Sequence, residues 1–121
     1  MALKNALKRL TTPVAELDRD RLREFCSRVE GVTCIADCAP RTEVTVAGEI
    51  TNVRIVPRPD GSPWLEATVK DGTGSIVVMW TGRTHIAGVS VGRRLRITGR
   101  GAPKGRNGRL MVLNPLYELL A

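Results

Sequence analysis

The stretch Val69-Lys70-Asp71-Gly72-Thr73-Gly74-Ser75-Ile76-Val77-Val78-Met79-Trp80 decides the fold of this chain. Its Asp-Gly pair is a turn dipeptide, because Asp caps its own backbone and Gly accepts a positive φ. After the turn, apolar side chains alternate along one face, which is typical of a strand: Ile76, Val78 and Trp80. The stretch therefore predicts two strands joined by a tight turn, with Trp80 in the core. A hairpin with so many apolar side chains is not stable alone in water, and other strands must therefore cover it.

Further strand patterns flank this hairpin. Val44, Val46, Gly48 and Ile50 share one face, and Val53 and Ile55 continue the pattern one residue out of step, which predicts a β-bulge in a long strand. The second strand is expected over Trp64–Lys70, with Leu65, Ala67 and Val69 inside and Trp64, Glu66, Thr68 and Lys70 outside. A fourth is expected over Arg93–Gly101 and a fifth over Arg109–Asn114, after which Leu116, Leu119 and Leu120 are expected to plug the core. Five strands with a long, coiled first strand predict a small closed barrel, for which the five-stranded OB-fold is the natural candidate.

The segment before the barrel has a helical pattern. Thr12-Pro13 is a typical helix start, Leu22, Phe25, Cys26 and Val29 form an apolar stripe, and Gly31 is a typical stop. We therefore expect a helix over about 14–29, within a helical extension and linker at 1–40 that precedes an OB-fold barrel at 41–121. The pattern does not decide whether this helix packs on the barrel or mediates dimerisation.

Three segments carry a family resemblance. They are Val44-Thr45-Val46-Ala47-Gly48-Glu49-Ile50, Asp71-Gly72-Thr73-Gly74-Ser75-Ile76, and Gly92 followed at a spacing of three by Leu95. Together they resemble the anticodon-binding type of OB-fold, and residues 109–118 resemble the end of the OB wedge domain of the helicase that reverses stalled replication forks. The whole is similar to the small stand-alone OB-fold proteins of actinobacteria. Over roughly residues 42–120, the resemblance implies a barrel that binds nucleic acid.

The charge distribution points the same way. The formal net charge is +7, and the segment between Gly72 and Tyr117 contains eight Lys and Arg residues and no Asp or Glu. Such one-sided charge favours a polyanionic partner, most often nucleic acid. A basic protein without such a partner is the alternative.

Candidate contacts follow from the way an OB-fold binds single strands, which lie over strands two and three and between the first and last loops. Trp64 is the candidate for base stacking, and a Trp packed under the N-terminal helix is the alternative. Val77 and Met79 either support a base or lie buried under the helix. The complete set of expected nucleic-acid contacts is Arg58, Trp64, Thr68, Lys70, Arg94, Arg96, Lys104, Arg106 and Arg109.

No catalytic or metal pattern emerges from the sequence. Cys26, Cys34 and Cys38 lack the paired spacing of a zinc site, and the single histidine lies far away in sequence. Gly88-Val89-Ser90-Val91-Gly92 matches a nucleophile elbow in letters alone, because no histidine follows the serine. We therefore expect a protein that is not an enzyme and that uses neither a metal nor a cofactor.

The expected partner is single-stranded DNA, with RNA also compatible. A module that binds a protein partner through the barrel surface or the N-terminal helix is the second hypothesis. No apolar run approaches the ~20 residues of a membrane span, and residues 1–10 do not form a secretory signal. We therefore expect a soluble protein of the cytoplasm, of undetermined oligomeric state.

Overall fold

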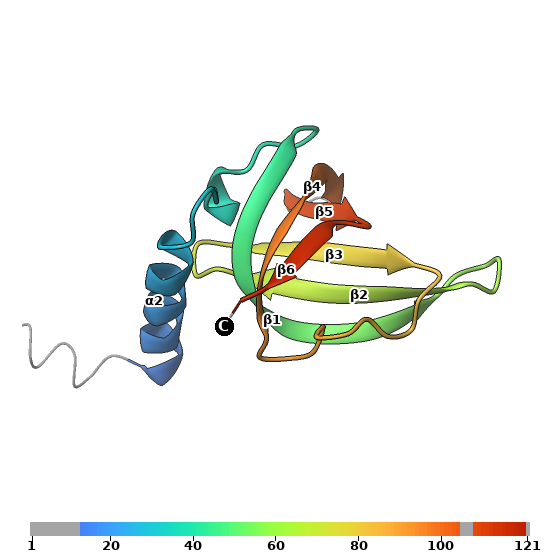
Figure 1. Cartoon of the computed structure of the whole chain (residues 1–121), viewed down its shortest axis with the longest axis horizontal. Coiled ribbons are helices and arrows are strands. Elements are labelled where there is room, and N and C mark those ends of the chain that lie inside the picture. The colour runs from blue at the N-terminus through green and yellow to red at the C-terminus, as the bar shows by residue number, and fades with distance from the viewer. Residues whose placement is uncertain (1–12, 105–107, 121) are drawn as a thin grey trace, which may run out of the picture.

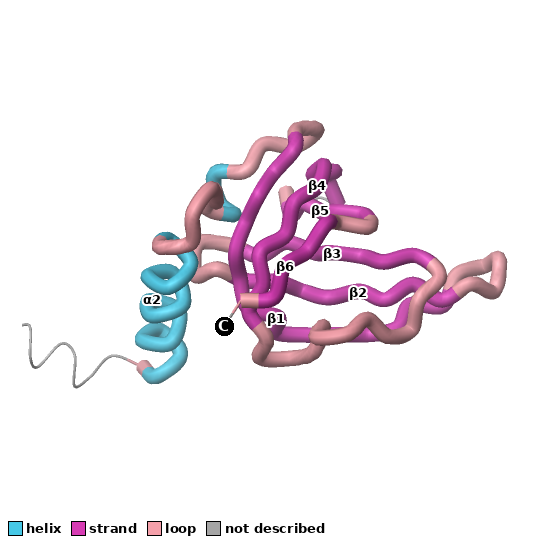
Figure 2. The backbone as a smooth tube through the Cα atoms, viewed as in Figure 1, coloured by secondary structure: helices cyan, strands magenta, loops and turns pink. Residues whose placement is uncertain are grey.

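The computed structural model describes residues 13–104 and 108–120. In this part of the chain, one sheet contains six strands: β1 (Glu43–Pro57), β2 (Pro63–Lys70), β3 (Ser75–Thr81), β4 (Arg94–Lys104), β5 (Arg109–Leu113) and β6 (Leu116–Leu119). Their order is β1-β2-β3-β5-β4-β6, and β1 also pairs with β4, so five strands close a ring. Figure 2 shows this ring as a curled ribbon of strands with a helix at one end. The predicted five-stranded OB-fold barrel is confirmed, with a sixth strand attached to β4.

The long strand β1 closes the barrel by changing partners along its length. It pairs with β4 from Glu43 to Glu49 and with β2 from Glu49 to Pro57, and Glu49 is opposite Arg94 on one side and Lys70 on the other. The register with β2 shifts between Ile50 and Asn52, which confirms the predicted bulge. A bulge bends its strand and increases the twist, and here the bend carries β1 from one neighbour to the other.

Alternate residues of the ring strands fill one core. The side chains with less than 2 % exposure include Val46, Ile50, Val69, Ile76, Val78, Leu95, Ile97 and Val112. Trp80 belongs to this core with 6 % exposure, as predicted, and its ring meets the Tyr117 ring edge-on with centroids 5.9 Å apart.

The C-terminal leucines differ from their prediction. Leu116 is 76 % exposed and Leu119 is 37 % exposed, and Leu120 is only partly buried, so the predicted plug of the core is wrong. Residues 116–119 instead form β6, which pairs with Leu95–Thr98 of β4. The reason is that β5 covers this edge of β4 only from Gly101 to Lys104. The remaining backbone groups need partners, and β6 provides them outside the ring.

An α-helix packs at one end of the barrel. This helix, α2 (Val14–Ser27), begins after Pro13 and ends two residues before the predicted end. Its Cys26 is buried, and the Arg94 guanidinium lies 4.3 Å from the centroid of the Phe25 ring. The helix therefore packs on the barrel, and Figure 1 shows it at the end opposite the tip of the β1–β2 hairpin.

A 3-10 helix, η1 (Ile35–Asp37), lies in the segment between α2 and β1. The division of the chain at residue 40 stays a prediction. Neither helical segment of the described residues has the length and apolarity that a membrane span requires.

Candidate nucleic-acid interface

The outward side of β2 carries the row of side chains that we name the β2 face: Trp64, Glu66, Thr68 and Lys70. The residues that alternate with them along the strand, Leu65, Ala67 and Val69, are buried in the core. Because successive side chains of a strand point to opposite sides, the four side chains of the β2 face point away from the core. The row begins at the β1–β2 hairpin and ends at the turn into β3, which lies near α2 (Figure 1).

Trp64 lies at the hairpin end of the β2 face. It is half-buried, and the Arg58 guanidinium from the hairpin loop lies 4.1 Å from its ring centroid. Because α2 packs at the opposite end of β2, the helix does not cover Trp64. An aromatic ring paired with a guanidinium offers both a stacking surface and a charge for a phosphate.

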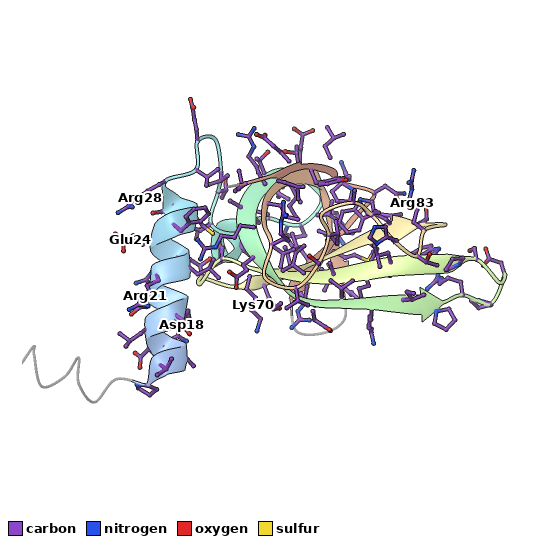
Figure 3. The ribbon with its side chains drawn as sticks, turned by 60° about the horizontal axis from the view of Figure 1, so that its bottom comes forward. Asp18, Arg21, Glu24, Arg28, Lys70 and Arg83 are labelled. Carbon is purple, nitrogen blue, oxygen red and sulfur yellow. The ribbon has the colours of Figure 1, made fainter. Side chains whose placement is uncertain are left out.

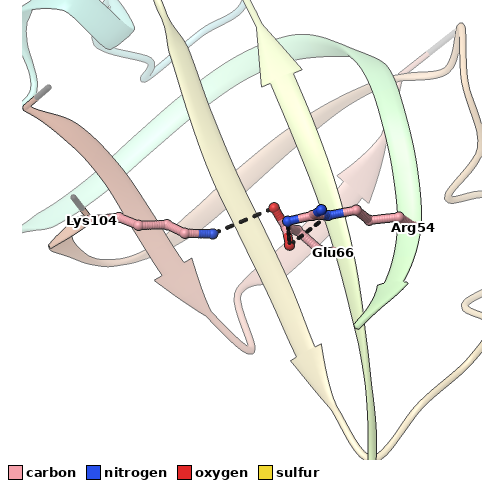
Figure 4. Close-up of polar contacts among 3 residues, drawn as sticks. All are labelled: Arg54, Glu66 and Lys104. Carbon is pink, nitrogen blue, oxygen red and sulfur yellow. Dashed lines mark hydrogen bonds and ion pairs between the residues drawn. The ribbon is translucent and has the colours of Figure 1, made fainter. Parts of the chain in front are cut away.

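Glu66 occupies the middle of the β2 face and is only 7 % exposed. Its Oε2 lies 3.0 Å from an Arg54 guanidinium nitrogen, and its Oε1 lies 3.4 Å from Lys104 Nζ. Arg54 comes from β1 and Lys104 from the end of β4, so the two cations reach Glu66 from opposite sides. Figure 4 shows the Lys104 ion pair crossing β3 on its way to Glu66. Glu66 therefore points outward as expected, but it is buried there, with the two cations paired to its carboxylate.

Arg54 also contributes to the β2 face, and no local sequence pattern singles it out. It stands directly across from Glu66 in the β1–β2 register, and opposite charges at such positions attract. The register was the missing information, since the bulge shifts it by one residue.

Val77 and Met79 offer no open surface to a base. They lie on the outward side of β3, yet only 1 % of Val77 and 4 % of Met79 is exposed. Their cross-strand neighbours on β2 are Thr68 and Glu66. The Glu66 ion pairs thus lie on the same side of the sheet as these two apolar side chains.

Arg94 and Arg96 lie away from Trp64 and Lys104. Both lie on the half of β4 that pairs with β1 and β6. Arg94 Nε lies 3.3 Å from Glu49 Oε1, whereas Arg96 pairs with Glu118 and donates a hydrogen bond of 3.2 Å to the Glu30 carbonyl. The structure separates these two arginines from Trp64 and Lys104.

The other predicted contacts are placed as follows. Lys70 ends the β2 face beside α2, and Thr68 is half-buried in its middle. Arg109 is half-buried at the start of β5, opposite Lys104. Arg106 lies outside the described residues. The structure thus brings Arg58 to Trp64 and brings Lys104 to the middle of the β2 face.

The thiols do not form a reactive centre in the described part of the chain. No group of three His, Cys, Asp or Glu side chains there is arranged to hold a metal ion. Burial, together with the negative charge of Asp71, raises the pKa of the Cys26 thiol to about 11. Burial also raises the pKa of Cys38. Since the thiolate is the nucleophile, Cys26 is inert near neutral pH.

Several solved structures have an architecture similar to that of this chain. RecG, solved bound to a three-way DNA junction, is similar with a TM-score of 0.61 and 21 % identity over 94 % of this chain, which spans only 16 % of RecG. The second OB-fold domain of replication protein A from Methanococcus maripaludis is similar with a TM-score of 0.54 and 20 % identity, over 73 % of this chain and 93 % of that domain. At these identities the likeness shows the fold.

A third solved structure adds to the comparison. The replication factor A related protein from Methanobacterium thermoautotrophicum is similar with a TM-score of 0.55 and 17 % identity, over 75 % of this chain and 92 % of that protein. Curated protein sequences give no match. Residues 44–120, which cover the whole barrel from β1 to β6, match the family described as OB-fold nucleic acid binding domain. With its ring of five strands and this match over more than half of its length, the chain belongs to the OB-fold nucleic acid binding domains.

Proposed function

We propose that this protein binds single-stranded DNA on the β2 face with little sequence preference, that it acts in the cytoplasm, and that it catalyses no reaction. The observation that carries the proposal is the Arg58–Trp64 pair, at 4.1 Å, at one end of a face whose middle is reached by Lys104. Membership of a nucleic-acid-binding family supports it.

In the proposed mode, one base stacks on Trp64 while phosphates approach cations on either side of the β2 face. Arg58 lies at the hairpin end, and Lys104 and Arg109 lie at the β4–β5 end, with Arg106 between them in sequence. Thr68 offers a hydroxyl between these ends. Stacking tolerates any base and phosphate contacts carry no sequence information, so the expected preference is slight.

Replacing Trp64 with Ala is expected to weaken binding of an oligo-dT strand about 5- to 150-fold, since stacking on an aromatic side chain contributes ~1–3 kcal/mol per base. Fluorescence anisotropy of a labelled dT12 strand at several salt concentrations measures this change. In the wild type, binding should fall steeply with salt and should quench tryptophan fluorescence. Trp80→Phe is the matched control for the fluorescence, because Trp80 is buried in the core.

Two results would contradict the proposal. The first is an absence of DNA binding by the wild-type protein even at low salt. The second is a Trp64→Ala variant that binds as tightly as the wild type. Stronger binding of an oligo-U strand than of dT12 would identify RNA as the ligand instead.

The Glu66 carboxylate is expected to lower the affinity for DNA. It places a negative charge between two cations, close to the phosphates of a DNA strand bound on the β2 face. Glu66→Gln removes this charge, which repels the phosphates, and should tighten dT12 binding roughly threefold to tenfold. Glutamine can still accept hydrogen bonds from Arg54 and Lys104. Glu118→Gln removes the partner of Arg96, away from Trp64 and Lys104, and should leave the affinity unchanged. Equal or weaker DNA binding by Glu66→Gln would show that the carboxylate does not oppose binding.

A further inference from the structure

A cavity of about 830 Å³ lies between α2 and the barrel. Its walls are one side of α2, the partner-changing point of β1, and the turn between β2 and β3. We name it the helix cavity. The charged side chains that line it are Asp18, Arg19, Arg21, Glu49, Lys70 and Arg94. Figure 3 shows Lys70 on the side of the barrel nearest α2, which carries Asp18 and Arg21.

The helix cavity has an excess of positive charge. Four of its side chains are cations and two are carboxylates. Arg94 is neutralised by Glu49 at 3.3 Å, whereas none of the ion pairs among residues 13–104 and 108–120 involves Arg19, Arg21 or Lys70. Gathering cations of one sign in a recess raises the local concentration of anions. Thr51 and Ser75 line the same recess and add hydroxyl donors.

The wall formed by α2 is held in place by contacts with the barrel. Gly72 packs so closely on the helix that a Cβ there would lie 2.6 Å from the Arg19 carbonyl oxygen. The Arg94 guanidinium lies 4.3 Å from the Phe25 ring centroid. The turn of α2 that carries Arg19 is therefore held against the β2–β3 turn, and a ligand would not have to bring the helix to the barrel.

The helix cavity continues the β2 face. Lys70 belongs to both, because it is the last residue of β2 and also lines the cavity. From Trp64 to Lys70 the strand advances roughly 20 Å at its usual rise per residue. A strand of nucleic acid that stacks on Trp64 can therefore follow β2 to the cavity.

We propose that the helix cavity is a second phosphate-binding site, which holds the backbone of the same DNA strand beyond the β2 face through Arg19 and Lys70. This inference rests on the proposed function. It assigns α2 to the interface, whereas an OB barrel is expected to bind through its strands and loops alone.

The test compares two double variants that lose the same charge. Arg19→Ala with Lys70→Ala removes two cations from the helix cavity. Arg41→Ala with Arg100→Ala removes two exposed cations that do not line it and that form no ion pair within the described ranges. The affinity for dT12 is measured by anisotropy as a function of salt. The cavity variant should bind at least tenfold more weakly, and the slope of log K against log salt should fall by about 1.4, or ~0.7 for each lost phosphate contact. The control variant should keep the wild-type slope.

A second measurement separates this inference from the proposed function. Tripolyphosphate is titrated into the labelled wild-type protein while the amide resonances of Gly72, Gly74 and Lys70 are followed by NMR. Shifts that disappear in the cavity variant support the site even if DNA does not bind. DNA binding by the wild type together with equal slopes for the two variants would overturn the inference and leave the proposed function intact. Absence of both DNA binding and resonance shifts would overturn both.

Discussion

Replacing Asp71 with Ala is expected to lower the free energy of unfolding by about 3 kcal/mol. The substitution removes a buried carboxylate that accepts several hydrogen bonds, and the donors of these hydrogen bonds would lose their partner. Asp71 is only 3 % exposed. Its Oδ1 accepts hydrogen bonds from the Thr73 amide at 2.8 Å, the Thr73 hydroxyl at 2.7 Å and the Gly74 amide at 3.1 Å. Its Oδ2 accepts one from the Ile35 amide at 2.8 Å. One side chain thus shapes the β2–β3 turn and fastens η1 to it.

Urea unfolding followed by circular dichroism measures this effect. Asp60→Ala is the matched control, because Asp60 makes the same kind of local turn, accepting hydrogen bonds from the Ser62 amide at 3.0 Å and the Ser62 hydroxyl at 2.7 Å, but at an exposed position. The control should cost less than about 1 kcal/mol, as is usual for exposed polar sites. If the two variants lost similar amounts of unfolding free energy, the burial of Asp71 would not be the reason for its large contribution to stability.

Replacing Gly72 with Ala is expected to detach α2 from the barrel. A Cβ at this position would lie 2.6 Å from both the Arg19 carbonyl oxygen and the Arg23 Cβ, and the residue has a φ of +88°. Neither contact involves the flexible end of a side chain, so the helix has to move away. The positive φ alone costs about 1 kcal/mol for a residue with a Cβ.

Reactivity of Cys26 measures the detachment. In a background in which Cys34 and Cys38 are replaced by Ser, Cys26 is the only thiol. Its pKa of about 11 and its burial keep the wild-type thiol inert. Detachment exposes the thiol and lowers its pKa towards the ordinary value, so alkylation at pH 8 should be at least tenfold faster in Gly72→Ala.

Gly92→Ala is the control that separates the backbone strain of a positive φ from the steric clash with α2. Gly92 has a φ of +91°, yet a Cβ there would meet nothing within 4 Å. This variant should lose some stability and keep Cys26 unreactive. Equal alkylation rates in wild type and Gly72→Ala would show that the helix tolerates the added methyl group.

The barrel could be predicted from local sequence patterns, because each pattern determines the local backbone geometry of its own strand or turn. The slip between Ile50 and Val53 located the bulge, and Asp71-Gly72 located the turn. Both features depend on residues close together in sequence. The phase of each strand then separated the core from the surface, so Trp80 and Val78 were placed correctly.

The C-terminal strand and the middle of the candidate site could not be found in this way. Leu116 and Leu119 resemble core residues in sequence, and their exposure follows from an edge of β4 that β5 leaves uncovered. The contact of Glu66 with Arg54 and Lys104 joins three strands, and its recognition requires the pairing register. Arg94 and Arg96 alternate outward as predicted, but only the order of strands around the ring places them away from Trp64.

The way in which β1 changes partners also sets the order in which the protein can fold. Its second half pairs with the neighbouring β2, whereas its first half pairs with β4, so that Glu43 meets Arg100. Contacts between residues so distant in sequence form slowly, because a long loop must close first. On the ribosome, β1, β2 and β3 emerge before β4, so the first half of β1 has no partner strand until β4 follows. Ring closure therefore waits for the C-terminal third of the chain, and until then the apolar side chains of β1, β2 and β3 lack part of their core and are open to association with other chains.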